Sequence, residues 1–404
     1  MTYASIDLGS DTVKIVVCEC CDNKYNVIAS TNTRVVGIKK GVIKDEAMVI
    51  KSIELAISEI EKQLGFRIDK AIISIPSYDV NINIYNGECE VSGLVSGSDI
   101  ATCFKKAIKE NVSDEEEVIT VFPIDFVIDD EERVIDPKGM NAYKLSTRVL
   151  ISTVPKELVY AYVDIFQKCN IEVIDLCFST LGDFYQSVNK DYQKNVGAVV
   201  NIGSSKTEIS IFNKGLMIKS LLIPMGSKMI DKDIKYVYHI DGINARNLKE
   251  KFALANSQYA EDEIIELVNL EGESMIISQR EISQIIEARI EEILKNVKKY
   301  LNNLTNKEIS YIIITGGITD IPGFSSVVEN VFGDIIHSVN MNVLGIRSNL
   351  YSSCMGMIKY LHEKLQLRGI NYTMYDLTSL KKEKKKTVLN DFVVEKIEEY
   401  LNNN

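Results

Sequence analysis

The stretch Ala4–Val17, ASIDLGSDTVKIVV, has a counterpart later in the chain in Val199–Phe212, VVNIGSSKTEISIF. Each stretch runs from an apolar strand through Asp or Asn and a Gly-Ser turn into an alternating strand, and a third extended run follows. The two copies are far apart in the sequence. They therefore predict a duplicated domain rather than a solenoid of short repeats.

The turns of the two copies suggest a phosphate site. Asp7 ends a strand, Gly9 lets the backbone approach closely, and the small hydroxyl residues that follow offer N–H and O–H groups to an anion. The carboxylate would hold Mg²⁺ through water. A plain glycine-containing hairpin is the alternative, but two matched copies favour a clamp on the β- and γ-phosphates of a nucleotide. The predicted phosphate contacts are Gly9, Ser10, Thr12, Lys14, Gly203, Ser204, Lys206 and Thr207, and Asp7 is the predicted metal residue.

A third motif, TGGITDIPGF at Thr315–Phe324, follows a buried strand. Without a Cβ, Gly316 and Gly317 let the backbone lie against a flat base or a ribose. A Gly-Gly pair after a strand is common, so this motif carries weight only together with the two turns.

The spacing of apolar residues predicts the helices and strands of the rest of the chain. Apolar residues at helical spacing predict a helix over 48–64, and Ser278–Glu281 is a capping box that opens a long helix to about Leu301. Between 84 and 152 the pattern changes to a strand, a helix and two further strands, typical of an insertion. After Leu365 the apolar pattern thins.

Composition excludes several classes of protein. The 404 residues carry 46 Lys+Arg against 57 Asp+Glu, a net charge of −11 that argues against nucleic acid as a partner. No apolar run approaches the roughly 18 residues of a membrane span. Three His and eight scattered Cys predict neither a His-based metal site nor a disulfide framework, and favour a reducing, cytoplasmic compartment.

In this order the motifs resemble the actin-like ATPase superfamily, and within it the FtsA family of bacterial cell-division proteins. The resemblance covers about residues 1–365 and is most specific in the insertion, where Asp136–Met140 reads DPKGM between two strands. The segment Leu221–Ala253 also resembles the stretch of the family's sequence that leads to the helix in contact with the nucleotide.

The resemblance implies an α/β fold, the actin-like two-lobed ATPase fold with a small inserted β-α-β-β (SHS2-type) domain. The expected division is 1–83 and 154–195 for the first lobe, 84–153 for the inserted domain, 196–226 and 303–365 for the core of the second lobe, 227–302 for a second-lobe subdomain, 366–386 for a flexible linker and 387–404 for an amphipathic helix. ATP and Mg²⁺ are the implied cofactors. Gly316, Gly317 and Lys249 are expected against the adenosine.

Two residues depart from the superfamily pattern. Asn201 stands where an aspartate usually helps to place the metal, and Arg246 stands where a ribose-binding carboxylate often lies. Nothing in Phe178–Asp183 singles out a catalytic base. Binding of ATP with slow or absent hydrolysis is therefore expected.

By the same resemblance, the chain polymerises and tethers the FtsZ ring to the cytoplasmic side of the cell membrane at the division site. The expected partners are FtsZ, further copies of this chain, membrane lipids and other division proteins. The alternatives are a kinase of the superfamily, a PilM-like pilus-assembly adaptor, and a scaffold that keeps the fold without nucleotide.

The tail carries the predicted membrane contact. Its apolar residues fall at helical spacing behind a lysine-rich run at 381–386, which would favour an anionic lipid surface. A helix of this length spans about 20 Å, enough to lie in the membrane interface but not to cross it. The polar face is acidic, so a helix that binds a protein or folds back on the body is the alternative. The apolar stripe consists of Leu389, Phe392, Val393, Ile397, Tyr400 and Leu401.

Overall fold

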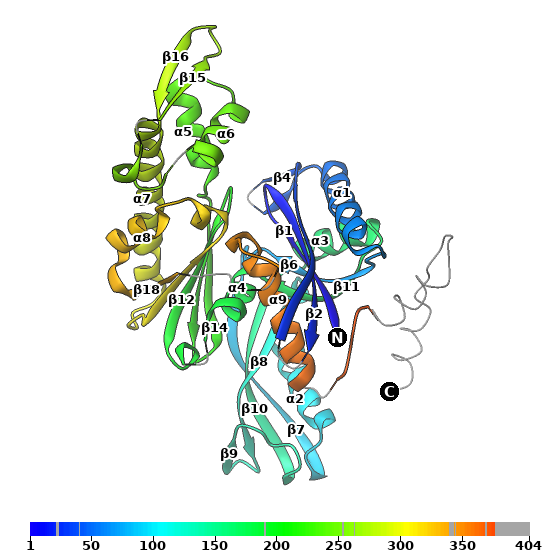
Figure 1. Ribbon diagram of the computed structural model, residues 1–404. Coiled ribbons are helices and arrows are strands. Elements are labelled where there is room, and N and C mark those ends of the chain that lie inside the picture. Colours follow the sequence, from blue (N-terminus) through cyan, green and yellow to red (C-terminus); the bar gives the residue numbers. More distant parts are fainter. Residues whose placement is uncertain are drawn as a thin grey trace, which may run out of the picture.

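The computed structural model describes residues 1–21, 24–39, 41–189, 191–252, 254–261, 263–338, 343, 345–367 and 370–375. Within them, two lobes are each built on a five-stranded sheet, and a separate four-stranded sheet lies below the first lobe in Figure 1.

The sheets of the two lobes repeat one topology. The orders β3-β2-β1-β6-β11 and β14-β13-β12-β17-β18 each contain two antiparallel pairings followed by two parallel pairings. The duplicated domain predicted from the two stretches is therefore present in the fold. The strands are β1 (Thr2–Leu8), β2 (Thr12–Cys21), β3 (Lys24–Arg34), β6 (Lys70–Ile75), β11 (Glu172–Phe178), β12 (Val196–Ile202), β13 (Thr207–Asn213), β14 (Leu216–Ile223), β17 (Tyr311–Thr315) and β18 (Ile336–Ser338).

Helices complete the lobes around two apolar cores, and the first of these cores also contains Val199, Phe212 and Tyr311 from strands of the second lobe. The predicted helix at 48–64 begins two residues earlier, because the Asp45 side chain caps it by accepting from the Met48 N–H. Gly65, with φ of 72°, ends it. The helices are α1 (Glu46–Leu64), α3 (Lys156–Lys168), α4 (Ser179–Ser187) and α9 (Ser352–Leu367) in the first lobe, and α7 (Gln279–Leu304) and α8 (Phe324–Phe332) in the second; a small hairpin of β4 (Ile38–Lys39) and β5 (Val42–Ile43) precedes α1.

The inserted sheet has the order β7-β10-β8-β9, with α2 packed on it. Its first strand begins at Asn81, ahead of the expected boundary at 84. The sheet also contains a short strand beyond the three expected from the sequence, which pairs Val134 with Phe126. The elements are β7 (Asn81–Leu94), α2 (Gly97–Asn111), β8 (Glu116–Ile128), β9 (Glu132–Val134) and β10 (Asn141–Pro155).

The part of the second lobe at 227–302 rises to the opposite end of the molecule from the inserted sheet (Figure 1). The predicted capping box is present, since the Ser278 side chain accepts from the Glu281 N–H and the Glu281 carboxylate accepts from the Ser278 N–H at 2.9 Å. Its elements ahead of α7 are α5 (Lys228–Tyr238), α6 (Gly242–Phe252), β15 (Ile264–Val268) and β16 (Ser274–Ser278).

Two glycines let α4 and α9 cross in backbone contact. A Cβ on Gly356 would lie 1.6 Å from the carbonyl oxygen of Gly182, and a Cβ on Gly182 would lie 2.6 Å from that of Ser353. A side chain at either position would force the two helices apart at this crossing.

Part of the expected linker is instead packed on the first lobe. Met374 donates its N–H to the carbonyl of Thr2 at 2.9 Å, and the buried Tyr375 hydroxyl donates to Lys70 O at 2.5 Å. These contacts correct the expectation that the linker begins at 366. The rest of the linker from 376 on, and the predicted membrane helix at 387–404, lie outside the described residues. In the described part of the chain, no helix is both long and apolar enough to span a bilayer.

Candidate functional site

The two predicted phosphate turns close in the same way. The Gly9 N–H donates to Thr12 O at 3.0 Å, and the Gly203 N–H donates to Lys206 O at 2.9 Å. A Cβ on either glycine would lie 3.0 Å from the same carbonyl oxygen that its N–H contacts. The duplication thus extends to the backbone of the turns.

Both turns face one cleft between the lobes, with a volume of about 380 Å³. Thr207 is the exception among the predicted residues: its side chain is fully buried and donates to Met225 O at 2.8 Å instead of lining the cleft. The predicted residues that line the cleft are Asp7, Gly9, Ser10, Thr12, Lys14, Asn201, Gly203, Ser204, Lys206, Lys249, Gly316 and Gly317.

Gly316 joins the third motif to the second turn. Its φ is 102°, a conformation that favours glycine, and a Cβ there would lie 2.3 Å from Ile202 O. Gly317 follows at the cleft wall. The backbone of the Gly-Gly pair is therefore held directly against the strand that ends in the second turn.

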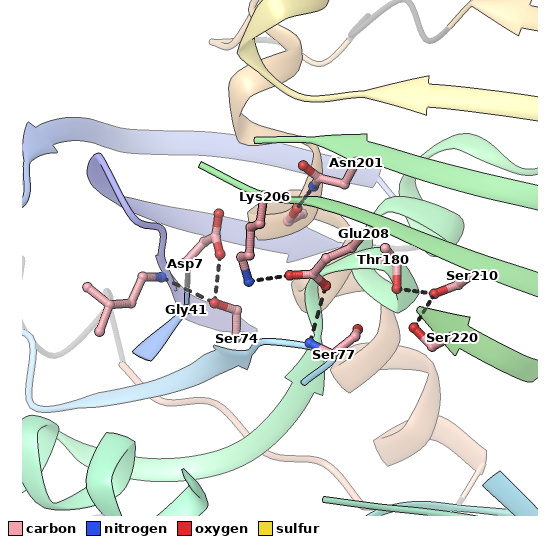
Figure 2. A network of polar contacts seen from close by, with 12 residues as sticks. Asp7, Gly41, Ser74, Ser77, Thr180, Asn201, Lys206, Glu208, Ser210 and Ser220 are labelled. Carbon is pink, nitrogen blue, oxygen red and sulfur yellow. Dashed lines mark hydrogen bonds and ion pairs between the residues drawn. The ribbon is translucent and has the colours of Figure 1, made fainter. Parts of the chain in front are cut away.

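Asp7 forms a nearly buried ion pair with Lys14, with 2.5 Å between Oδ2 and Nζ. Ser74 of β6 donates to the other carboxylate oxygen at 2.6 Å, as Figure 2 shows. Burial alone would raise the pKa of Asp7, but Lys14 and Ser74 together hold that pKa below its ordinary value. The carboxylate therefore stays ionised at neutral pH, as a metal ligand must.

Glu208 is a site residue that the sequence reasoning missed. It is almost fully buried, forms an ion pair with Lys206, and accepts from the Ser77 N–H of the first lobe at 3.3 Å (Figure 2). An acidic residue within a predominantly buried strand was the available signal. Glu208 therefore connects the second turn to the opposite lobe.

The helix α6 contributes two cations to the cleft. Arg246 reaches across it to Asp11 in the first turn, with 2.8 Å between Nη1 and Oδ2. It also pairs with Glu250 of its own helix at 2.6 Å, and Lys249 pairs with Asp231 at 2.5 Å. With Lys14 and Lys206, every Lys and Arg among the described residues that line the cleft is paired with a carboxylate.

The side-chain amide of Asn201 is held by hydrogen bonds to residues of α4 and α9. It donates to Asp183 of α4 at 2.6 Å and to Ser353 of α9 at 3.2 Å, and Ser353 donates to Asp183 at 3.1 Å. Burial raises the pKa of Asp183 to about 6. Asp183 does not itself line the cleft, but it is hydrogen-bonded to Asn201, which does.

The other polar residues of Phe178–Asp183, Ser179 and Thr180, have different surroundings. Ser179 lines the cleft, whereas Thr180 is hydrogen-bonded to Ser210 of β13 at 2.6 Å (Figure 2). The run therefore places Ser179 at the cleft and Thr180 against a strand of the second lobe.

Known proteins match this chain in sequence and in fold. A family model described as "Cell division protein FtsA" matches residues 198–356, and one described as "SHS2 domain inserted in FTSA" matches residues 77–153. The cell division protein FtsA of Bacillus subtilis is 28% identical over 374 residues, which are 91% of this chain and 85% of that protein.

Two solved structures share the fold. The PilM-PilN type IV pilus biogenesis complex matches with a TM-score of 0.61 and 12% identity over 92% of this chain and 99% of that chain. MreB5 of Spiroplasma citri bound to ADP matches with a TM-score of 0.56 and 14% identity over 91% of this chain and 98% of that chain. At these identities the structures show the fold alone, the actin-like two-lobed α/β fold. Together the two family models cover more than half of the sequence, and the chain therefore belongs to the FtsA family of bacterial cell-division proteins.

Proposed function

We propose that this chain binds ATP with Mg²⁺ in the interlobe cleft and serves cell division as a self-associating adaptor that tethers the FtsZ ring to the cytoplasmic membrane. The observation that carries the nucleotide part is the pair of turns with the same backbone closure, facing each other across one cleft beside Gly316. The solved MreB5 of the same fold was obtained with ADP, which supports a nucleotide as the ligand.

The cleft residues fit a magnesium-bound triphosphate. Backbone N–H groups of the two turns and the side chains of Lys14 and Lys206 would hold the phosphates, and Asp7 offers the carboxylate oxygen that Mg²⁺ prefers. Six carboxylates but only four cationic side chains line the cleft. Because the lining is net negative, we expect a triphosphate to bind far more weakly without its divalent cation.

Hydrolysis is expected to be slow. Asn201 is neutral, and its amide is directed to Asp183 and Ser353 rather than being a second anionic ligand for a metal. Asp11 of the first turn is paired with Arg246, so Asp7 is left as the strand-end carboxylate that would place the metal and the attacking water.

The nucleotide proposal is tested by titration calorimetry of the purified protein with Mg-ATP, followed by an assay of phosphate release. We expect Asp7→Ala and Gly316→Val to lower ATP affinity at least tenfold, because the first removes the metal ligand and the second forces a Cβ into Ile202 O. Gly242→Ala is the matched control, since a Cβ at Gly242 meets nothing within 4 Å. Unchanged affinity in both cleft variants would mean that the nucleotide binds elsewhere. Turnover of about one per second or faster would contradict slow hydrolysis.

The assembly proposal is tested separately. Membership in a division family supports a role at the septum, and actin-like chains polymerise through head-to-tail contacts that need not close. We assign part of that contact to the inserted domain and the docking of FtsZ to the subdomain at 227–302. A deletion of 84–153 is expected to abolish filaments on lipid in electron micrographs. Persistent filaments would refute that assignment, and unchanged FtsZ binding by a chain lacking 227–302 would refute the other.

A further inference from the structure

Beside the Gly-Gly pair, the cleft wall is completed by two short 3₁₀ turns, Gly317–Asp320 and Asn349–Tyr351. They lie against each other, because a Cβ on Gly317 would approach Leu350 Cδ1 to 3.2 Å. Asn349 lines the cleft at this point. It therefore lies beside the Gly-Gly pair, where the adenosine is expected.

The orientation of the Asn349 amide is fixed by its neighbour Thr319. The Thr319 hydroxyl donates its one proton to Gly316 O at 2.8 Å, so it can only accept from Asn349. Asn349 Nδ2 donates to that hydroxyl oxygen at 3.1 Å. The backbone is held as well, since the Asn349 N–H donates to Asp320 at 3.3 Å. The amide nitrogen is thus committed to Thr319, and the carbonyl oxygen Oδ1 is left as an acceptor.

That acceptor is buried and has no hydrogen-bond partner among the residues that the structure describes. A buried carbonyl without a donor is costly, and a ligand that supplies the donor recovers that cost. Adenine carries an exocyclic amine on its six-membered ring, whereas guanine carries a carbonyl oxygen at the same position.

We infer that Asn349 selects adenine over guanine, by accepting a hydrogen bond from the exocyclic amine of the base at Oδ1. The inference rests on the proposed nucleotide binding in this cleft and names the group that chooses the base. A guanine would set its carbonyl oxygen against Oδ1, two acceptors with no proton between them. Thr319 maintains the selection, because the amide cannot turn its nitrogen to the base without losing the contact with the hydroxyl.

The test compares three nucleotides by calorimetry with Mg²⁺ present: ATP, GTP, and purine riboside triphosphate, which lacks only the exocyclic amine. The wild-type protein should bind ATP about tenfold more tightly than the amine-free analogue. Asn349→Leu should remove this difference by weakening ATP alone. Asn349→Asp keeps an acceptor and should preserve it. Thr319→Val frees the amide to rotate, so it should narrow the preference for ATP over GTP. Thermal melting of each variant establishes that it is folded.

An equal loss of all three nucleotides in Asn349→Leu would overturn the inference, because it would indicate contact with the ribose or phosphates that they share. Unchanged ATP affinity in Asn349→Leu would overturn it too. If the wild-type protein bound none of the three, the proposed function itself would fail, and the inference with it.

Discussion

The crossing of α4 and α9 allows a sharp test of the fold beneath the cleft. In Gly356→Ala the new Cβ would lie 1.6 Å from the Gly182 carbonyl oxygen and 2.3 Å from its carbon. Carbon and oxygen need more than about 3 Å, so the helices must separate by roughly 1.5 Å. Neither neighbour can rotate away, because the obstructing atoms belong to the backbone.

The separation affects contacts that join the two helices. The rings of Tyr185 and Tyr360, whose centroids are 5.3 Å apart, lose an aromatic contact of about 1 kcal/mol. The bond from Ser353 to Asp183, 3.1 Å long, contributes about 1.5 kcal/mol. Overpacking adds about 2 kcal/mol. A total near 4.5 kcal/mol should lower the melting temperature of a chain of 404 residues by roughly 5 °C.

The measurement is thermal unfolding followed by circular dichroism, with Gly242→Ala as the control. That substitution adds the same methyl group at the start of α6, where a Cβ has no neighbour within 4 Å, and should leave the melting temperature unchanged. Gly182→Ala, with its Cβ 2.6 Å from Ser353 O, should fall between the two. A Gly356→Ala protein that melts within 2 °C or so of the wild type would refute the reasoning.

Three further predictions follow from Asp183, Asn201 and the tail. Because burial raises the pKa of Asp183 from 3.8 to about 6, the protonated form stabilises the folded state, and this contribution is present below about pH 4 and lost as the pH rises through 6. Melting curves should therefore show Asp183→Asn gaining stability relative to wild type between pH 4.5 and 7.5, and a difference that does not depend on pH would contradict this. Asn201→Asp would set a second carboxylate 2.6 Å from Asp183, so the melting temperature of this variant should drop at pH 7.5 and recover at pH 5. Equal melting temperatures at the two pH values would exclude the contact. In sedimentation with anionic liposomes, a chain ending at Thr387 and the Phe392→Asp variant should both lose binding that high salt weakens in the full chain; binding by the truncated chain would place the tether elsewhere.

The sequence predicted best what local signals encode. The two Gly-Ser turns and the Ser278 capping box each depend on a few neighbouring residues, and each was found where expected. The partners of the charged residues were not predictable in this way. Arg246 and Asp11 are separated by 235 positions in the sequence, and Ser77 and Glu208 by 131. Only the folded chain brings such pairs together.

The expected linker failed for a related reason. Residues 370–375 read INYTMY, with alternating apolar side chains, but the run is short and leads into a charged stretch, so it resembles a tether. Met374 and Tyr375 nevertheless fill sites on the first lobe that are formed by residues near the other end of the chain and by Asp69 and Lys70. Nothing in the local pattern reveals those sites.

The attachment of 370–375 has a mechanical consequence. Tension applied to the chain beyond Tyr375 enters the first lobe at its sheet, through the bond between Met374 and Thr2 and the bonds of the Tyr375 hydroxyl to the Lys70 backbone. These bonds link the end of the described chain to β1 and β6, the strands that carry Asp7 and Ser74. A pull on the chain at Tyr375 is thus transmitted to the two strands that lead to the cleft, both of which belong to the first lobe.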